Sequence, residues 1–264
     1  MWRQARYGTR MSTPTALTIA GSDPSGGAGL QADLATFVDH GVYGMAVPTA
    51  LTAQNTRGVV DVWPVPPAFL RLQLEVLFAD MRVDAVKIGM LHGVDEVHVV
   101  ADVLAALHPR PPIVLDPVLL AKGGRALLSP DGVEALRARL LPLVTLVTPN
   151  LPEAAVLGRD LPVAALVKGG HGGTDPVVDV LHQPGRPPVR YPHRRIEVDG
   201  RRWEPRGTGC VLASAIAARL ACGASLPDAC EGAITYVSGL IARSVHEVQP
   251  GGGSPVLRHG GAER

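Results

Sequence analysis

The sequence predicts a single α/β domain, with a doubly wound and mostly parallel sheet that has helices on both faces. Short apolar runs alternate along the chain with longer helical patterns, which is typical of parallel strands joined by crossover helices. Polar or glycine-rich turns follow most of these runs, where open α/β sheets bind their ligands. With 264 residues, 46% of them hydrophobic, the chain can bury a full core, and no linker divides it.

The first elements of the sheet lie near the N-terminus. Residues 16–20 form an apolar run that predicts a buried strand, and a helical pattern through Leu30, Leu34 and Phe37 follows the next loop. A second helical pattern covers residues 94–107. The other strands expected in the parallel part of the sheet cover residues 84–90, 112–115, 143–147 and 163–167.

The C-terminal part of the chain predicts edge strands and two helices. Residues 177–181 and 189–198 alternate apolar and polar side chains as antiparallel edge strands do, and Asp199-Gly200 is a turn signal after them. Helical patterns then cover residues 208–222 and 226–245. The edge strands would return the chain to the loop before the first of these helices.

Both ends of the chain are expected to lie outside the folded domain. We assign the domain to residues 15–248, with residues 1–14 as a disordered N-terminal extension. Residues 249–264 are too glycine-rich to pack, so we expect a disordered tail there.

Composition argues against several classes of protein. The net charge is +1 and aromatic residues make up only 4%, so no surface for nucleic acid is indicated. The three cysteines lack C-x-x-C spacing, which indicates neither a disulfide framework nor a zinc site and fits a reducing cytoplasm. No apolar segment typical of a signal peptide precedes Thr15, and no uncharged stretch is long enough to span a membrane. We therefore expect a soluble cytoplasmic protein.

The loop before residue 211 is the first candidate site. Gly207, Thr208 and Gly209 lie where a loop becomes a helix, so their N–H groups and the positive end of the helix can bind a phosphate. Cys210 follows, and a thiol at a helix N-terminus has a lowered pKa and can act as base or nucleophile. The alternative is a glycine-rich turn before a core helix, with an incidental buried cysteine.

The loop over residues 21–29 is the second candidate site, because it joins a strand to a helix. It matches neither G-x-G-x-x-G nor a Walker A motif, so a flexible turn stays open as the alternative. Asp33 in the next helix is a functional carboxylate or only a capping charge. Gln54 has an amide that donates and accepts, as recognition of a nitrogen heterocycle requires, or it is a satisfied loop glutamine.

Three charged residues follow predicted strands in the middle of the chain. Asp116 and Glu153 offer the oxygens that Mg²⁺ prefers, and Mg²⁺ is usually held by one or two carboxylates plus substrate phosphate. Lys168 stands at a strand end beside glycines, as a mobile charge for polyphosphate. The alternatives are a first-turn charge for Glu153 and an exposed hairpin at Lys168, and His171 in that loop is a weaker candidate.

Seven motifs together give the chain a resemblance to a known family. In chain order they are Leu17–Gly29 with Gln31-Ala32-Asp33, Thr49–Thr56, Lys87–Leu91, Leu115–Val118, Thr148–Ala154, Lys168–His171 and Gly207–Cys210. Over residues 15–248, the chain resembles the hydroxymethylpyrimidine/phosphomethylpyrimidine kinases of thiamine biosynthesis, in the ribokinase-like superfamily. Sugar kinases of that superfamily carry aspartate at the position of Cys210, so the cysteine indicates the pyrimidine or pyridoxal branch.

The resemblance implies a ribokinase-like fold, ATP as phosphate donor, Mg²⁺ as metal ion and a small pyrimidine as acceptor. The residues that would line the pyrimidine pocket are Gly21, Asp33, Gln54, Met90 and Val118. The residues that would serve Mg²⁺ and the ATP phosphates are Asn150, Glu153 and Lys168. The loop from Gly207 to Gly209 would be the anion hole.

The implied reaction is ATP-dependent phosphorylation of 4-amino-5-hydroxymethyl-2-methylpyrimidine and then of its monophosphate. Cys210 would take the proton of the hydroxymethyl group in the first transfer, whereas a monophosphate is largely ionised and hardly needs a base. Two other functions stay open: a pyridoxal kinase of the same branch, and a pyrimidine-binding protein that no longer transfers phosphate. A nicotinamide-dependent enzyme is disfavoured because no G-x-G-x-x-G follows the first strand.

The chain departs from the family pattern at two places. Pro205-Arg206 stands where the family usually has Thr-His, so an arginine there adds a phosphate contact or blocks the pocket. Only fourteen residues separate Glu153 from Lys168, where family members usually fit a further helix. Losing that helix would bare one side of a strand, and we expect an oligomer interface or a shifted loop to cover it. We accordingly expect a homodimer.

Overall fold

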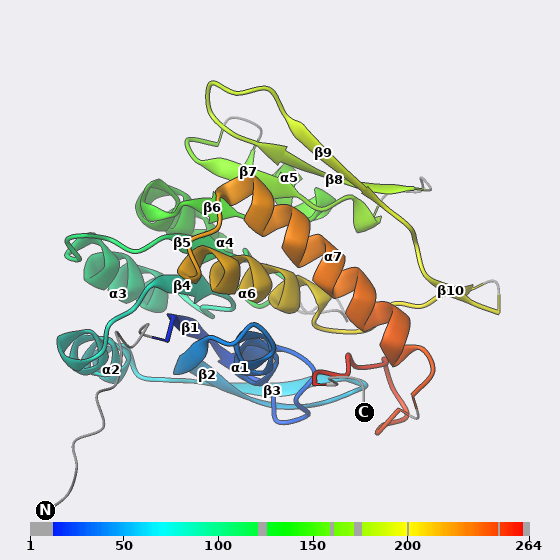
Figure 1. Cartoon of the computed structure of the whole chain (residues 1–264). Helices are drawn as coiled ribbons and strands as arrows, with labels where there is room; N and C mark the ends of the chain where they lie inside the picture. Colours follow the sequence, from blue (N-terminus) through cyan, green and yellow to red (C-terminus); the bar gives the residue numbers. More distant parts are fainter. Residues whose placement is uncertain are drawn as a thin grey trace, which may run out of the picture.

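A nine-stranded sheet forms the centre of the molecule in the computed structural model (Figure 1). The structure describes residues 13–120, 126–158, 161–171, 176–199, 201–247 and 249–260. The strand order is β3-β2-β1-β4-β5-β6-β7-β8-β9. The strands are β1 (Thr15–Ser22), β2 (Tyr43–Asn55), β3 (Gly58–Pro64), β4 (Ala85–Ile88), β5 (Ile113–Leu115), β6 (Leu146–Val147), β7 (Ala164–Val167), β8 (Val177–His182) and β9 (Val189–His193).

The six central strands, from β2 to β7, are parallel, and the strands at both edges are antiparallel. This confirms the mostly parallel sheet and an antiparallel strand over residues 177–181, but that strand, β8, lies between β7 and β9 and is not at the edge. The strand expected over residues 189–198 is divided in two. Its first part is β9, and its second part, β10 (Glu197–Val198), pairs with β11 (Arg201–Arg202) in a separate ribbon. The turn predicted there includes Asp199 in the left-handed region, with φ 51°, and Gly200 lies outside the described residues.

Helices cover both faces of the sheet, as expected. The helices are α1 (Gly29–Asp39), α2 (Pro67–Asp80), α3 (Val94–Ala105), α4 (Pro130–Ala135), α5 (Leu151–Leu157), α6 (Thr208–Ala221) and α7 (Leu226–Ser244), with short turns η1 (Leu136–Leu140), η2 (Leu141–Leu143) and η3 (Gly169–His171). Side chains of α2, α3 and α4 share one hydrophobic core, and those of α1, α6 and α7 share the other. Figure 1 shows α7 lying beside α6 on the same side of the sheet. Among the described helices, none is long and apolar enough to cross a membrane.

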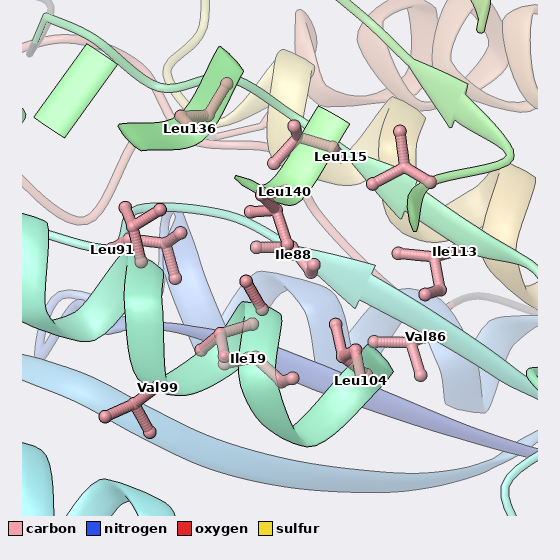
Figure 2. Close-up of a cluster of buried hydrophobic side chains, with 14 of the residues drawn as sticks. Ile19, Val86, Ile88, Leu91, Val99, Leu104, Ile113, Leu115, Leu136 and Leu140 are labelled. Carbon is pink, nitrogen blue, oxygen red and sulfur yellow. The ribbon is translucent and has the colours of Figure 1, made fainter. Parts of the chain in front are cut away.

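The two cores arise from the alternation of side chains along the strands. On β1, Leu17 and Ile19 belong to the first core, whereas Ala16 belongs to the second. Figure 2 shows part of the first core, where Ile19 of β1 and Ile88 of β4 pack with side chains of α3. Strands buried on both faces read as continuous apolar runs, which is why β1, β4, β5, β6 and β7 could be predicted.

Several elements of the fold were not predicted, among them β2, β3, α2 and α4. Strand β3 at the sheet edge has no buried residue, so it lacks the apolar alternation that identifies a strand. Helix α2 buries only Leu70 and Leu74, while Phe69, Leu72 and Val76 are exposed, which blurs its amphipathic pattern. The sequences of β3 and α2 therefore show only weak hydrophobic periodicity.

The expectation that a shortened segment bares a strand was wrong. Leu166 of β7 packs in the core of α6 and α7, and Ala165 packs in the opposite core. Leu157 at the end of α5 is 1% exposed and packs on the same side as Ala165. Small alanine side chains on β7 and one short helix thus suffice to bury the strand within the chain.

The expectation that the glycine-rich tail does not pack was also wrong, for residues 249–260. Leu257 is 7% exposed and belongs to the core of α6 and α7. The N–H of Ser254 donates to the carbonyl of Thr56 in the β2–β3 hairpin, at 2.7 Å. A Cβ at Gly253 would lie 2.2 Å from that carbonyl, so the glycine permits the close approach. Residues 1–12 and 261–264 lie outside the described residues.

Candidate active site

Side chains that follow the carboxyl ends of three neighbouring parallel strands meet at that end of the sheet. Asp116 follows β5, Glu153 lies in the first turn of α5 after β6, and Lys168 follows β7. The Lys168 ammonium lies 2.9 Å from Asp116 Oδ1 and 4.0 Å from Glu153 Oε2. The sequence predicted all three residues. The alternative of an exposed hairpin at Lys168 is wrong, because its side chain is only 16% exposed.

Asn150 and Glu153 form a capping box at the start of α5. The Asn150 side-chain oxygen accepts from the Glu153 N–H, and Glu153 Oε2 accepts from the Asn150 N–H, both at 2.8 Å. Asn150 also pairs with Lys168 as an isolated parallel bridge. Glu153 is therefore a first-turn charge, and the same contact holds its carboxylate beside the Lys168 ammonium.

At these strand ends the two carboxylates, Asp116 and Glu153, carry more negative charge than the single ammonium of Lys168 compensates. Burial raises the pKa of Glu153 to about 7, because loss of water outweighs the attraction of Lys168 and Asp116 adds repulsion. The described residues contain no cluster of three or more His, Cys, Asp or Glu side chains suited to a metal ion. Two hard carboxylates with surplus charge fit Mg²⁺, which commonly takes few protein ligands and completes its shell with phosphate and water.

The N-terminus of α6 approaches these strand ends through glycines. Gly207 has φ 79°, and a Cβ there would lie 1.9 Å from the carbonyl oxygen of Gly27. A Cβ at Gly209 would lie 3.3 Å from both Lys168 Nζ and Asp116 Oδ2. Thr208 is the first residue of the helix, whose initial N–H groups have no intrahelical acceptor. The arrangement suits an anion bound between the helix and Lys168.

The expectation of a lowered pKa for Cys210 was wrong. Burial raises the pKa of the thiol to about 11, although the Lys87 ammonium and the Gly29 N–H oppose this effect. The carboxylates of Asp116 and Asp33 raise it further. Loss of water therefore outweighs both opposing effects, those of Lys87 and Gly29. The same interactions place the sulfur among charged side chains, so it is not an incidental core cysteine.

Asp33 does not line the site, contrary to the expectation. Its carboxylate is completely buried and accepts hydrogen bonds from three side chains. Oδ2 accepts from Thr18 Oγ1 at 2.6 Å and from Lys87 Nζ at 2.7 Å, and Oδ1 accepts from Ser214 Oγ at 2.8 Å. These partners come from β1, β4 and α6, so Asp33 joins the elements beneath the site.

Lys87 was not recognised as a site residue, although a lysine within an apolar strand is an available signal. It is completely buried and forms the ion pair with Asp33. Burial alone would lower the pKa of Lys87, but the charges of Asp33, Cys210 and Asp116 outweigh it and raise the pKa. Lys87 is thus a fixed cation under Cys210.

Four of the residues expected around the pyrimidine lie at the ends of β1, β2, β4 and β5. A Cβ at Gly21 would lie 2.4 Å from Met90 Cε, and Met90 packs with Val118. Gln54 lies at the end of β2, in the hairpin rather than in a loop, and is partly exposed. Thr52, two residues before it, donates to the Ser22 carbonyl at 2.8 Å, which holds β2 against the loop after β1.

Asp179 of β8 is another residue that sequence reasoning missed. It is buried, and its Oδ1 accepts from the Gly169 N–H at 2.7 Å, directly after Lys168. An acidic residue alternating with apolar ones on a strand expected at the edge reads as a solvent-facing position, which concealed this role. The side chain of His171 lies outside the described residues.

The sheet order, the glycine loops at the strand ends and the helix N-terminus facing Lys168 define a kinase of the ribokinase-like class. Residues 23–256 match the family described as phosphomethylpyrimidine kinase. The chain belongs to that family.

Individual relatives agree with this assignment. Over 254 residues the chain is 43% identical to the hydroxymethylpyrimidine/phosphomethylpyrimidine kinase of Escherichia coli (strain K12), covering 89% of this chain and 93% of that protein. The crystal structure of phosphomethylpyrimidine kinase from Clostridium difficile 630 is similar, with TM-score 0.72 and 35% identity over 86% of this chain and 99% of that one. The ADP complex of Bacillus subtilis pyridoxal kinase gives TM-score 0.82 and 32% identity over 94% and 98%.

The Asp33–Lys87 ion pair yields a prediction about stability. Lys87→Met leaves the buried Asp33 carboxylate without its cation, so the free energy of unfolding should fall by about 3–5 kcal/mol. Lys87→Met combined with Asp33→Asn should recover part of that loss. Denaturant unfolding measures both changes. As a control, Arg71→Met in the exposed pair with Asp102 should cost no more than about 1 kcal/mol, and an equal cost at Arg71 and Lys87 would contradict the prediction.

Proposed function

We propose that the protein uses ATP to phosphorylate 4-amino-5-hydroxymethyl-2-methylpyrimidine and then its monophosphate, in thiamine biosynthesis. The observation that carries this proposal is the convergence of Cys210, Lys168 and Asp116 at the N-terminus of α6. Family membership and the relatives named as kinases of these two pyrimidines support the choice of substrate.

Positioning and charge neutralisation supply most of the catalysis in phosphoryl transfer. We assign the transferred phosphoryl group to the N–H groups of residues 207–209 and to the ammonium of Lys168, which Asp116 holds in place. Asp116 and Glu153 would hold Mg²⁺, which when bound neutralises charge on the phosphate oxygens. Asn150 fixes the Glu153 carboxylate through the capping box. Gly21, Gln54, Met90 and Val118 would surround the pyrimidine ring.

Cys210 is the proposed base for the first transfer. The hydroxymethyl group must lose its proton as its oxygen attacks, and we assign the acceptance of that proton to the thiolate of Cys210 beside the anion loop. With a pKa of about 11, the Cys210 thiol is almost entirely protonated at neutral pH, and only its small thiolate fraction can accept the proton, so this step should be slow and strongly pH-dependent. The acceptor oxygen of the monophosphate is already ionised and needs no base.

Pyridoxal is the second candidate acceptor, because the Bacillus subtilis protein of similar structure is a pyridoxal kinase. A coupled assay of ADP production with hydroxymethylpyrimidine, its monophosphate and pyridoxal separates the possibilities. We expect turnover of both pyrimidines to exceed that of pyridoxal. Pyridoxal as the preferred acceptor would replace the proposal, and pyrimidine binding without ADP production would indicate a binding protein that no longer transfers phosphate.

We infer that two copies of the chain associate through the β2–β3 edge and α2. Leu51 and Trp63 lie opposite each other on these strands and are 51% and 73% exposed. Phe69, Leu72 and Val76 form an exposed apolar stripe along the neighbouring α2. Exposed apolar side chains gathered on neighbouring elements in this way commonly mark an association site.

Replacing Cys210 by Ala should separate the two transfers. We expect kcat with hydroxymethylpyrimidine to fall about 100-fold or more, and kcat with the monophosphate to fall less than about tenfold. With the wild type, kcat/KM for the alcohol should rise by about tenfold per pH unit between about pH 7 and about pH 9, because the thiolate fraction does so below its pKa. Exposed Cys222 provides the control, Cys222→Ala. Equal losses in both assays would contradict the base role.

The affinity for Mg²⁺ should depend on Glu153 and on pH. Because the ion needs the ionised carboxylate, whose pKa is raised to about 7, binding should strengthen as the pH rises from about 6 to about 8. Calorimetric titration of Mg²⁺ into the protein with ADP measures this. Glu153→Gln should weaken binding and flatten the pH dependence, whereas Glu134→Gln on the surface of α4 should change neither. Unchanged binding in Glu153→Gln would remove Glu153 from the metal site.

The association site predicts the effect of a charge at position 63. Trp63→Lys should convert the dimer into a monomer, because a lysine in an apolar interface loses its water without a partner. Light scattering during size-exclusion chromatography gives the mass. Val189→Lys, at an exposed position on β9 at the other edge of the sheet, should stay dimeric. A monomeric wild type, or a dimeric Trp63→Lys variant, would refute this interface.

A further inference from the structure

The side chain of Arg206 connects segments that are far apart in the sequence. Its Nη2 lies 3.0 Å from Asp23 Oδ2, and its Nη1 donates to Ser25 Oγ at 3.1 Å and to the Asn55 carbonyl at 2.5 Å. The side chain is 12% exposed. A single guanidinium therefore holds both the loop after β1 and the end of β2, one residue before the anion loop.

Asp23 depends on this contact. It is 1% exposed, and its Oδ1 accepts from the N–H and the hydroxyl of Ser25, at 2.9 and 2.7 Å. Its Oδ2 accepts no hydrogen bond from any residue that the structure describes, so only the ion pair with Arg206 compensates its charge. A buried carboxylate without that cation would be costly, and the loop would have to rearrange to hydrate it.

The C-terminal segment fixes Arg206 from the other side. The Arg206 N–H donates to the Pro255 carbonyl at 2.8 Å. A Cβ at Gly27 would lie 2.8 Å from Val256 Cγ1 and 3.1 Å from Arg206 Cδ. The loop is thus enclosed between the arginine and the tail, and the tail is itself attached to the hairpin through Thr56.

We propose that Arg206 is a positioning residue that sets the affinity for the acceptor pyrimidine. Two residues assigned to the pyrimidine pocket flank its contacts: Gly21 lies two residues before Asp23, and Gln54 lies next to Asn55. By holding both against the anion loop, Arg206 fixes the separation between the acceptor and the phosphoryl group. This inference rests on the proposed function, because it takes the pyrimidine as acceptor.

The ATP side of the site has its own supports. Lys168, Asp116 and Glu153 hold one another, and Asp179 holds the chain after Lys168. None of the contacts of Arg206 given above involves these residues. Loss of Arg206 should therefore affect the acceptor much more than the nucleotide, whereas a general loosening of the fold would affect both.

The test measures binding of hydroxymethylpyrimidine to the nucleotide-free full chain by calorimetry, and KM for ATP by coupled assay. Arg206→Met should weaken pyrimidine binding by about tenfold or more while KM for ATP stays within about twofold, because a buried charge loses its partner on the acceptor side only. Arg206→Lys keeps the charge but loses the planar guanidinium that contacts several groups at once. Its affinity for the pyrimidine should lie between those of Arg206→Met and the wild type.

A double-mutant cycle with Asp23→Asn identifies the mechanism. Because the neutral amide no longer requires a cation, Arg206→Met should weaken pyrimidine binding less in the Asp23→Asn background than in the wild type. If Arg206→Met does not fold, Arg206→Lys and the Asp23→Asn variants, alone and combined with Arg206→Met, keep the test available. Arg71→Met is the control, since its exposed pairs, with Glu75 of α2 and Asp102 of α3, do not involve the residues that the Arg206 side chain contacts.

Two results would overturn the inference: pyrimidine binding unchanged in Arg206→Met, or a parallel rise in KM for ATP. Additive effects of Arg206→Met and Asp23→Asn would overturn the ion-pair mechanism. A wild type that does not bind the pyrimidine would instead contradict the proposed function, and with it this inference. The two failures are therefore distinguishable in the same titration.

Discussion

The buried ion pair between Asp33 and Lys87 is the interaction on which the site depends. It joins α1 to β4, and through Thr18 and Ser214 it also reaches β1 and α6. Ser214 lies one turn after Cys210, so the hydrogen bond to Asp33 fixes the rotation of α6 and with it the direction of the Cys210 side chain. Buried charges are tolerated only when paired and hydrogen-bonded, and this pair is held by both.

The charged groups on the two sides of Cys210 differ in how fully their charges are compensated: Asp33 lies beneath the sulfur, and Lys168 with its two carboxylates lies above it. Beneath it, Asp33 has three donors and no exposed surface. Above it, one ammonium, Lys168, serves two carboxylates, and burial, together with repulsion from Asp116, raises the pKa of Glu153 despite the attraction of Lys168. The fully hydrogen-bonded Asp33 carboxylate provides rigidity. The carboxylates beside Lys168 are incompletely compensated, so they retain the capacity to bind a cation and, beside a helix N-terminus, phosphate.

Much of the site could be predicted because it lies where parallel strands end. Asp116, Glu153 and Lys168 each follow an apolar run, and the glycines before α6 mark a loop that must approach other backbone. The roles of Asp33 and Arg206 could not be predicted, since each depends on partners distant in sequence. The pKa of Cys210 was mispredicted because burial, which sequence does not reveal, outweighs the charge of Lys87 and the Gly29 N–H. The tail packs through one leucine and several close backbone contacts, which composition alone conceals.

The contact between Gly207 and the Gly27 carbonyl affects how any scan of substitutions would be interpreted. Every L-amino acid at position 207 meets two obstacles, an unfavourable backbone conformation and a collision with the neighbouring peptide, before a nucleotide is present. Inactivity of a substituted protein would therefore report on assembly of the two loops as much as on catalysis. Structural measurements on such proteins without ligand would separate the effect of the substitution on folding from its effect on the chemistry.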